Sequence, residues 1–161
     1  MLYALENAYS GDRFHAVRRN LEGLTEAEFH VRPGNHRVEV FGPNPELSIA
    51  DLVLHVGGAL RMYTNHAFGD RSMAWSDSRG LPAGMEEMLT WLDEAHAGFV
   101  AGIEELQDDA ELDVLREAPW GTRLPTRQLI SYMTNHEVYH SGEINRQRSL
   151  LRGAEGWVVD R

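Results

Sequence analysis

The sequence predicts an all-α protein that folds as a four-helix bundle with long connecting loops. Apolar residues recur at helical spacing over four separate segments, and loops rich in Pro and Gly divide these segments. Strand signals are scarce, and four amphipathic helices of this length bury their apolar faces by packing against one another. The chain has 161 residues, which suits one domain with a core of its own, so we assign residues 1–161 to a single domain.

The first helical segment covers about residues 2–22, where apolar side chains repeat every three or four positions from Leu2 to Leu21. The phase of this repeat slips near Gly11 and Asp12, so we expect a weak point there. A long irregular connection follows over residues 30–47, within which Val38-Glu39-Val40 is a candidate for a brief extended piece.

The second segment begins at Ser48 and ends near His66. Ser48 and Asp51 form a variant of the capping box, with Asp in the place of the usual Glu. The apolar stripe of this helix includes His55. Gly57 and Gly58 follow that histidine, and we expect them to let another backbone approach or to open a cavity.

The third segment covers about residues 84–106, and its apolar stripe includes His96. The fourth begins near Thr126, directly after a proline, and ends near Gly153, a residue typical of helix C-termini. The stripe of this last helix contains both His136 and His140.

Composition excludes several function classes. The net charge is −10, which argues against nucleic acid or an anionic membrane as a partner. All 15 basic residues are arginine, so Schiff-base chemistry, pyridoxal phosphate attachment and a phosphate-loop lysine are excluded. The chain has no cysteine, so a metal would have to be held by histidine and carboxylate.

The sequence carries no signal for membrane insertion or export. The N-terminus lacks a basic region followed by an apolar run. No apolar stretch approaches the length that spans a bilayer. We therefore expect a soluble cytoplasmic protein.

The stretch HEVYH places His136 and His140 one helical turn apart. Residues four positions apart on a helix differ by about 40° in direction, so both imidazoles can point at one atom. The apolar stripe directs both rings towards the bundle interior, where they need polar partners. Hydrogen-bonded carboxylates would satisfy them, but a metal satisfies both rings at once, and we favour the metal.

Two histidines are candidates for a third ligand, His55 on the second segment and His96 on the third. If both helices run antiparallel to the fourth, each histidine lies about 15–16 Å from the end of its helix. His136 and His140 lie at a similar depth, about 15–21 Å from the start of theirs, so depth alone does not decide. We expect the other four histidines on loops or surfaces: His15, His30, His36 and His66.

HEVYH also matches H-E-x-x-H, the spacing of zinc proteases. The extended protease motif would need Gly at position 143 and His at position 146, where this chain has Glu143 and Arg146. The chain has few strands to align a peptide substrate. We therefore do not favour a protease.

A di-iron bundle is a second alternative. Glu137-x-x-His140 is the E-x-x-H pattern of such bundles, and Asp93-x-x-His96 would be its imperfect partner. Glu6 and Asp51 would have to supply the further carboxylates. This hypothesis gives His55 and His136 no role, and we rank it below a single-metal site.

Three stretches together resemble the DinB/YfiT-like superfamily of small metal-binding bundles: SIADLVLH at 48–55, Pro119-Trp120-Gly121, and NHEVYHSGEI at 135–144. The resemblance covers essentially the whole chain. It implies an up-down-down-up topology and a metal site formed by His55, His136 and His140. It also implies zinc or nickel as the metal, a homodimer, and a role in stress responses.

The chain departs from the family pattern after His140. The family often has His-Arg-Gly-Gln there, whereas this chain has Ser141, Gly142 and Glu143. The missing arginine removes a contact to a substrate anion, and Glu143 makes the region more negative.

Three neutral histidines leave one coordination position open, which is typical of catalytic sites. Characterised relatives that the chain resembles use low-molecular-weight thiols such as mycothiol or bacillithiol. We therefore expect an S-transferase that acts on small electrophiles with an external thiol as cosubstrate. The alternatives are a hydrolase that activates water, with Glu137 flanking the metal as base, and a non-enzymatic metal-stabilised binding protein. We assign Glu137 a catalytic role. We assign Trp120 and Tyr139 roles in substrate binding. Trp120 could cover the cleft as a lid, or it could instead be an aromatic residue of the core.

Overall fold

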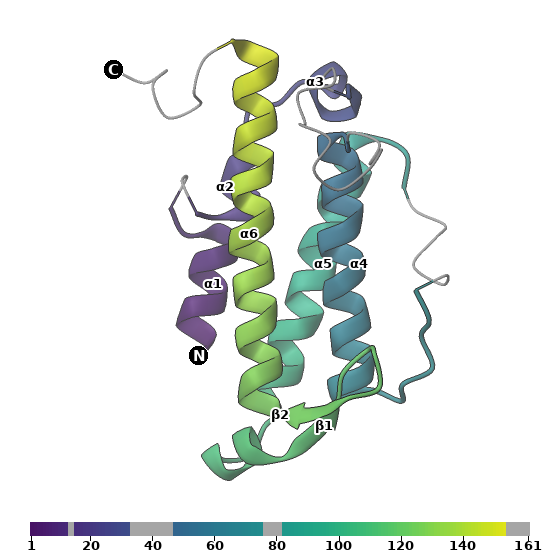
Figure 1. Cartoon of the computed structure of the whole chain (residues 1–161), viewed down its shortest axis with the longest axis vertical. Helices are drawn as coiled ribbons and strands as arrows, with labels where there is room; N and C mark the ends of the chain where they lie inside the picture. The colour runs from purple at the N-terminus through teal and green to yellow at the C-terminus, as the bar shows by residue number, and fades with distance from the viewer. Residues whose placement is uncertain (13–14, 33–46, 76–81, 154–161) are drawn as a thin grey trace, which may run out of the picture.

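The computed structural model describes residues 1–12, 15–32, 47–75 and 82–153, and most of them are helical (Figure 1). The prediction of an all-α, bundle-like fold is confirmed. The helices are α1 (Leu2–Ser10), α2 (Val17–Asn20), α3 (Glu26–His30), α4 (Ile49–Phe68), α5 (Met85–Glu104) and α6 (Thr126–Arg152). A 3₁₀ helix, η1 (Asp109–Asp113), and two short strands, β1 (Leu115–Glu117) and β2 (Arg123–Pro125), connect α5 to α6.

The first predicted helix is divided in two. α1 ends at Ser10, and the chain becomes helical again only at Val17. Gly11 caps α1, and a Cβ at this position would collide with the side chain of Asn7. The expected weak point near Gly11 is therefore a break, and the prediction of one continuous helix over 2–22 is wrong.

The predicted ends of two long helices are confirmed. At the start of α4, the Ser48 hydroxyl accepts a hydrogen bond from the Asp51 amide at 3.1 Å, and the Asp51 carboxylate accepts one from the Ser48 amide at 2.8 Å. This reciprocal pair satisfies two amides that the helix itself leaves without acceptors. At the other end of the chain, Gly153 adopts a left-handed conformation with φ of 65° and ends α6.

Two features went unpredicted. Thr25 and Glu28 form a capping box that starts α3, although this helix has only five residues. β1 and β2 pair as an antiparallel hairpin, in which Leu115 faces Pro125. The strands have three residues each, too few for a hydrophobic period to show in the sequence. The proposed extended piece at Val38–Val40 lies outside the described residues.

The long helices pack side by side around a common apolar core. α6 contacts α1 and α2 as well as α4, and α4 also packs along α5 (Figure 1). One cluster of buried side chains joins all of these helices, including Leu5, Val17, Leu52, Phe99, Met133 and Ile144. None of the described helices is long and apolar enough to cross a membrane.

Gly57 allows α5 to approach α4 closely. The ring of Trp91, on α5, lies against this glycine, so that a Cβ at position 57 would overlap the ring. The close approach expected at the glycine pair is therefore made by a side chain rather than by another backbone.

Replacing Gly57 by Ala should destabilise the protein, because the new methyl group must displace Trp91 or separate α4 from α5. We expect a loss of about 1–3 kcal/mol in the free energy of unfolding, measured by urea denaturation. Gly98→Ala on α5 is the matched control. No atom lies within 4 Å of the Cβ position there, so alanine should stabilise that helix by up to about 1 kcal/mol. Equal effects of the two variants would contradict the proposed role of Gly57.

Candidate metal centre

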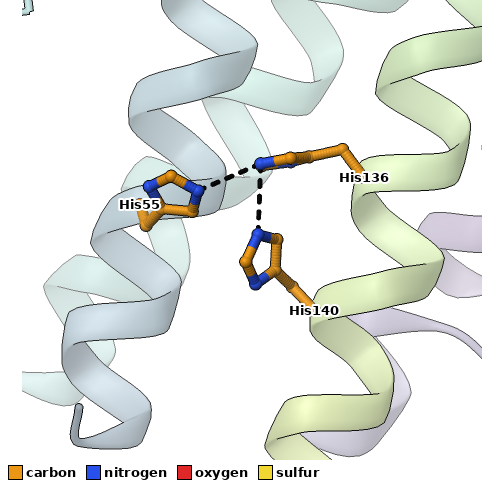
Figure 2. Close-up of side chains that lie close together, drawn as sticks. All are labelled: His55, His136 and His140. Carbon is orange, nitrogen blue, oxygen red and sulfur yellow. Dashed lines mark hydrogen bonds between the residues drawn. The ribbon is translucent and has the colours of Figure 1, made fainter. Parts of the chain in front are cut away.

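Three histidines meet in the space between α4 and α6 (Figure 2). His55 comes from α4, and His136 and His140 come from successive turns of α6. The Nε2 atom of His136 lies 3.0 Å from Nε2 of His55 and 3.1 Å from Nε2 of His140. Across the described parts of the chain, these three residues form the one group of three or more potential metal ligands with converging donor atoms.

The three rings differ in their exposure. His140 is buried, His136 is half-buried and His55 is exposed. The cluster therefore has an interior side on α6 and an open side at His55. Solvent therefore reaches the cluster on the side of His55.

Burial keeps these imidazoles neutral. Burial, together with a smaller effect of the neighbouring histidine rings, lowers the pKa of His136 to about 3 and that of His140 to about 4. Burial also lowers the pKa of His55, although Glu143 opposes the shift. At neutral pH all three rings are in the unprotonated form that binds metals.

Glu143 determines which nitrogen of His140 carries the proton. The Glu143 carboxylate lies 2.7 Å from Nδ1 of His140. An ionised carboxylate only accepts hydrogen bonds, so Nδ1 of the neutral ring is the donor and Nε2 keeps its lone pair. That lone pair points into the cluster, and a carboxylate behind a histidine ligand is typical of protein metal sites. The sequence signal for this contact is the spacing of His140 and Glu143, three residues apart on one helix; the sequence analysis predicts only that Glu143 makes the region more negative.

The cluster fits a divalent metal ion. Tetrahedral ligands at 2.0–2.1 Å from zinc lie about 3.3 Å from one another, and the observed Nε2 separations of 3.0 and 3.1 Å are slightly shorter. A donor set made only of imidazoles suits zinc and nickel. Small movements of the rings would bring these donors to the ligand spacing.

His96 is not part of the cluster. Its Nδ1 lies 3.1 Å from Oε1 of Glu137, and its Nε2 lies 3.5 Å from a carboxylate oxygen of Glu6. The ring of Tyr9 stacks on it at a centroid distance of 3.7 Å. Between the two candidate third ligands, the structure therefore brings His55 and not His96 to the histidine pair.

Glu137 lies in a different environment from the one expected. Its side chain is fully buried and bonds to His96, between α5 and α6. Burial raises the pKa of this carboxyl group, and the hydrogen bond from His96 partly offsets the rise. Among the described residues, no contact joins Glu137 to the three clustered histidines, contrary to the expectation that it flanks the metal.

The same arrangement weighs against a di-iron site. Glu137 and Glu6 approach opposite nitrogens of His96, so the three groups do not converge on one point. They are also absent from the single ligand group found in the described chain.

The two proposed substrate-binding aromatics are both exposed. Trp120, in the turn of the hairpin, has an exposed fraction of 53%, which excludes a core role. Its ring lies 5.8 Å from that of Tyr63 on α4 and 6.2 Å from that of Tyr132 on α6. Tyr139 packs edge-on against His140, with 4.9 Å between ring centroids.

The remaining histidines lie apart from the cluster. His15 and His30 are exposed, as expected. His66 is an exception to the expectation of loops and surfaces, because it lies on α4, is half-buried and donates from Nε2 to the carbonyl of Met73. His36 lies outside the described residues.

Ser141 stands where the family often has arginine. It is fully buried, and its hydroxyl lies 2.6 Å from the side-chain nitrogen of Asn20. Position 141 therefore faces α2 rather than the three histidines.

The sequence matches the DinB superfamily over residues 11–144, a range that contains all three clustered histidines. None of the curated proteins is similar enough to count as a match.

Replacing His136 by Ala should abolish metal binding, because its Nε2 is the atom that lies next to both other histidines. After loading with zinc and removal of the excess, wild-type protein should retain one ion per chain and the variant close to none, as measured by inductively coupled plasma mass spectrometry. His30→Ala, an exposed histidine on α3, is the control and should keep the full content. Unchanged zinc in the His136 variant would refute the site.

Glu143→Gln offers a graded form of the same experiment. The amide can accept a hydrogen bond from His140 but carries no charge, so zinc affinity should fall by about 10–100-fold. An affinity equal to that of the wild type would remove Glu143 from the site.

Proposed function

The chain belongs to the DinB superfamily, and on this basis we propose that it is a metal-dependent enzyme in which His55, His136 and His140 hold one divalent ion, zinc or nickel. The convergence of three neutral Nε2 atoms supports this proposal most directly. Three protein ligands leave a coordination position open, as in catalytic rather than structural zinc sites.

The reaction that we propose is transfer of a low-molecular-weight thiol to a small electrophile. A divalent ion at this site supplies positive charge that favours a thiolate over the thiol. The protein has no cysteine, so the thiol must come from outside, as with bacillithiol or mycothiol. The exposed side of the cluster at His55 gives such a molecule access.

The transfer step is a nucleophilic substitution or addition. The sulfur forms a bond to the electrophilic carbon of the substrate. In a substitution, the leaving group departs with the electron pair of its bond, and the thiol proton passes to solvent. The three histidines would hold the metal ion, and Glu143 would keep His140 in the tautomer whose Nε2 binds it.

The aromatic side chains beside the cluster support an apolar or aromatic substrate. Tyr132 precedes His136 by one helical turn, about 6 Å along α6, and its ring lies next to that of Trp120. Tyr139 covers the other side of the cluster, next to His140. We propose that Trp120 and Tyr139 form the two walls of a substrate site, because exposed aromatic rings bind planar and apolar groups.

The second candidate is a hydrolase that activates water. This reaction needs a general base near the metal, and the residue expected in that role, Glu137, bonds to His96 instead. The carboxylate that does lie near the cluster, Glu143, is engaged with His140. These contacts favour thiol transfer over hydrolysis.

We also propose that the long helices follow the up-down-down-up course that the resemblance implies. Gly57 of α4 lies against Trp91 of α5, and Gly102 further along α5 lies against Phe68 at the end of α4. This order supports parallel α4 and α5, and the path of the chain in Figure 1 supports the opposite direction for α1 and α6. A crystal structure with α4 and α5 antiparallel would refute the topology.

The proposed reaction is tested by turnover of 1-chloro-2,4-dinitrobenzene by zinc- or nickel-loaded protein, with bacillithiol, with mycothiol and without thiol. We expect product only when a thiol is present, and loss of the enzymatic rate in His136→Ala. Trp120→Ala should keep the metal and raise KM by up to about tenfold, because a stacking surface is lost.

The other outcomes separate the alternatives. Cleavage of 4-nitrophenyl acetate without any thiol, abolished in His136→Ala, would replace the transferase by the hydrolase. Zinc binding without turnover of either compound would contradict enzymatic activity on these substrates and favour a binding protein.

A further inference from the structure

A cavity lies at the C-terminal end of α4, away from the metal centre. It has a volume of about 460 Å³ and lies between the end of α4, the following loop and the hairpin. This volume falls within the range of small-molecule sites, about 300–1,000 Å³. His66 of this cavity is eleven residues from His55 on α4, or about 16 Å along the helix. The cavity is therefore separate from the three histidines.

Positive side chains dominate the cavity. Arg71, Arg116 and Arg123 line it together with one carboxylate, that of Glu117. Such a concentration of arginines stands out in a chain with a net charge of −10. A site of this kind attracts anions and disfavours cations.

Arg116 forms a fixed wall of the cavity. Its guanidinium donates to the Thr126 hydroxyl at 2.9 Å, to the carbonyl of Ala67 at 3.0 Å and to the Glu111 carboxylate at 3.0 Å. These bonds tie the hairpin to α4 and α6. Arg116 thus contributes positive charge, but its donors are committed to the protein.

The guanidinium groups of Arg71 and Arg123 have N–H donors that are available to a ligand. Arg71 donates to Glu117 at 3.3 Å, and Arg123 donates to the carbonyl of Leu115 at 3.1 Å. A guanidinium carries five N–H donors, so each of these bonds uses a small part of the available set. Both side chains can therefore donate to a ligand in the cavity.

The backbone at Arg71 is strained. Its φ is 62°, and within the described chain no other residue except glycine has a positive φ. Glycine or asparagine is usual in this conformation, and a long side chain there carries an energetic cost. Such strain often marks a position where the side chain has a function.

His66 presents a buried atom that needs a partner. Its Nε2 donates to the carbonyl of Met73 at 3.0 Å, so Nδ1 of the neutral ring is an acceptor. This Nδ1 is buried and has no hydrogen-bond partner among the described residues. Buried polar atoms without partners are rare, and this one belongs to a residue that lines the cavity.

From these observations we propose that the cavity binds a small molecule through a phosphate group. The phosphate oxygens accept hydrogen bonds from Arg71 and Arg123, which both line the cavity. A carboxylate fits less well, because it presents only two oxygens to guanidinium groups on different segments. The volume beyond the phosphate accommodates the organic part of the ligand.

The proposal is tested by isothermal titration calorimetry with inorganic phosphate, with and without zinc loaded at the histidine site. We expect one phosphate per chain in both forms, since the two sites are separate. Arg71→Gly should bind phosphate about tenfold more weakly, and it should not lower the melting temperature without phosphate, because glycine relieves the positive φ. Arg123→Gln should weaken binding similarly.

Arg19→Gln is the matched control, because it makes the same charge change at an exposed residue of α2 and should leave phosphate affinity unchanged. Three results would overturn the proposal: no phosphate binding to the wild type, binding only to the zinc-loaded form, or equal weakening in Arg19→Gln and Arg71→Gly. Binding of acetate as tight as that of phosphate would contradict the choice of a phosphate group.

Discussion

The packing of α4 against α6 is the contact on which the candidate metal centre depends. α6 alone supplies two histidines one turn apart, and α4 brings Nε2 of the third, His55, to 3.0 Å from Nε2 of His136. The same packing removes water from the rings and lowers the pKa of each. Assembly of the ligand set and its unprotonated state therefore have one physical cause, which is the burial of α6 against its neighbour.

The H-E-x-x-H stretch is divided between two faces of α6. His136 and His140 face α4 and the metal centre, whereas Glu137, about 100° further round the helix, enters the core and bonds to His96. In a zinc protease the glutamate of this motif acts on the substrate. Here Nδ1 of the buried imidazole bonds to Oε1 of the buried carboxylate, which offsets part of the cost of keeping these two groups away from water. The match to a protease motif is thus a match in spacing without the corresponding geometry.

The sequence predicted the features that depend on residues close together in the chain, and it left open those that depend on how the helices pack. The start of α4 at Ser48 and the end of α6 at Gly153 follow from capping rules that involve a few neighbouring residues, and both were predicted correctly. The choice between His55 and His96 depends on which helix faces which, and the spacing along the chain left it open. The contact between Glu137 and His96 was not predicted either, because it too depends on which helix faces which. The sequence did not predict the hairpin, because strands of three residues leave no periodic pattern. The hairpin nevertheless positions Trp120 beside Tyr63 and Tyr132.

X-ray absorption at the zinc edge of the metal-loaded protein tests the central claim most directly, because it reports the ligands of the bound ion itself. Our account predicts a four-coordinate ion with three imidazole nitrogens at about 2.0–2.1 Å and one further light atom from solvent. Addition of bacillithiol should replace that light atom by sulfur at about 2.3 Å. A spectrum with fewer than three imidazoles would contradict the assignment of His55, His136 and His140 as the ligands.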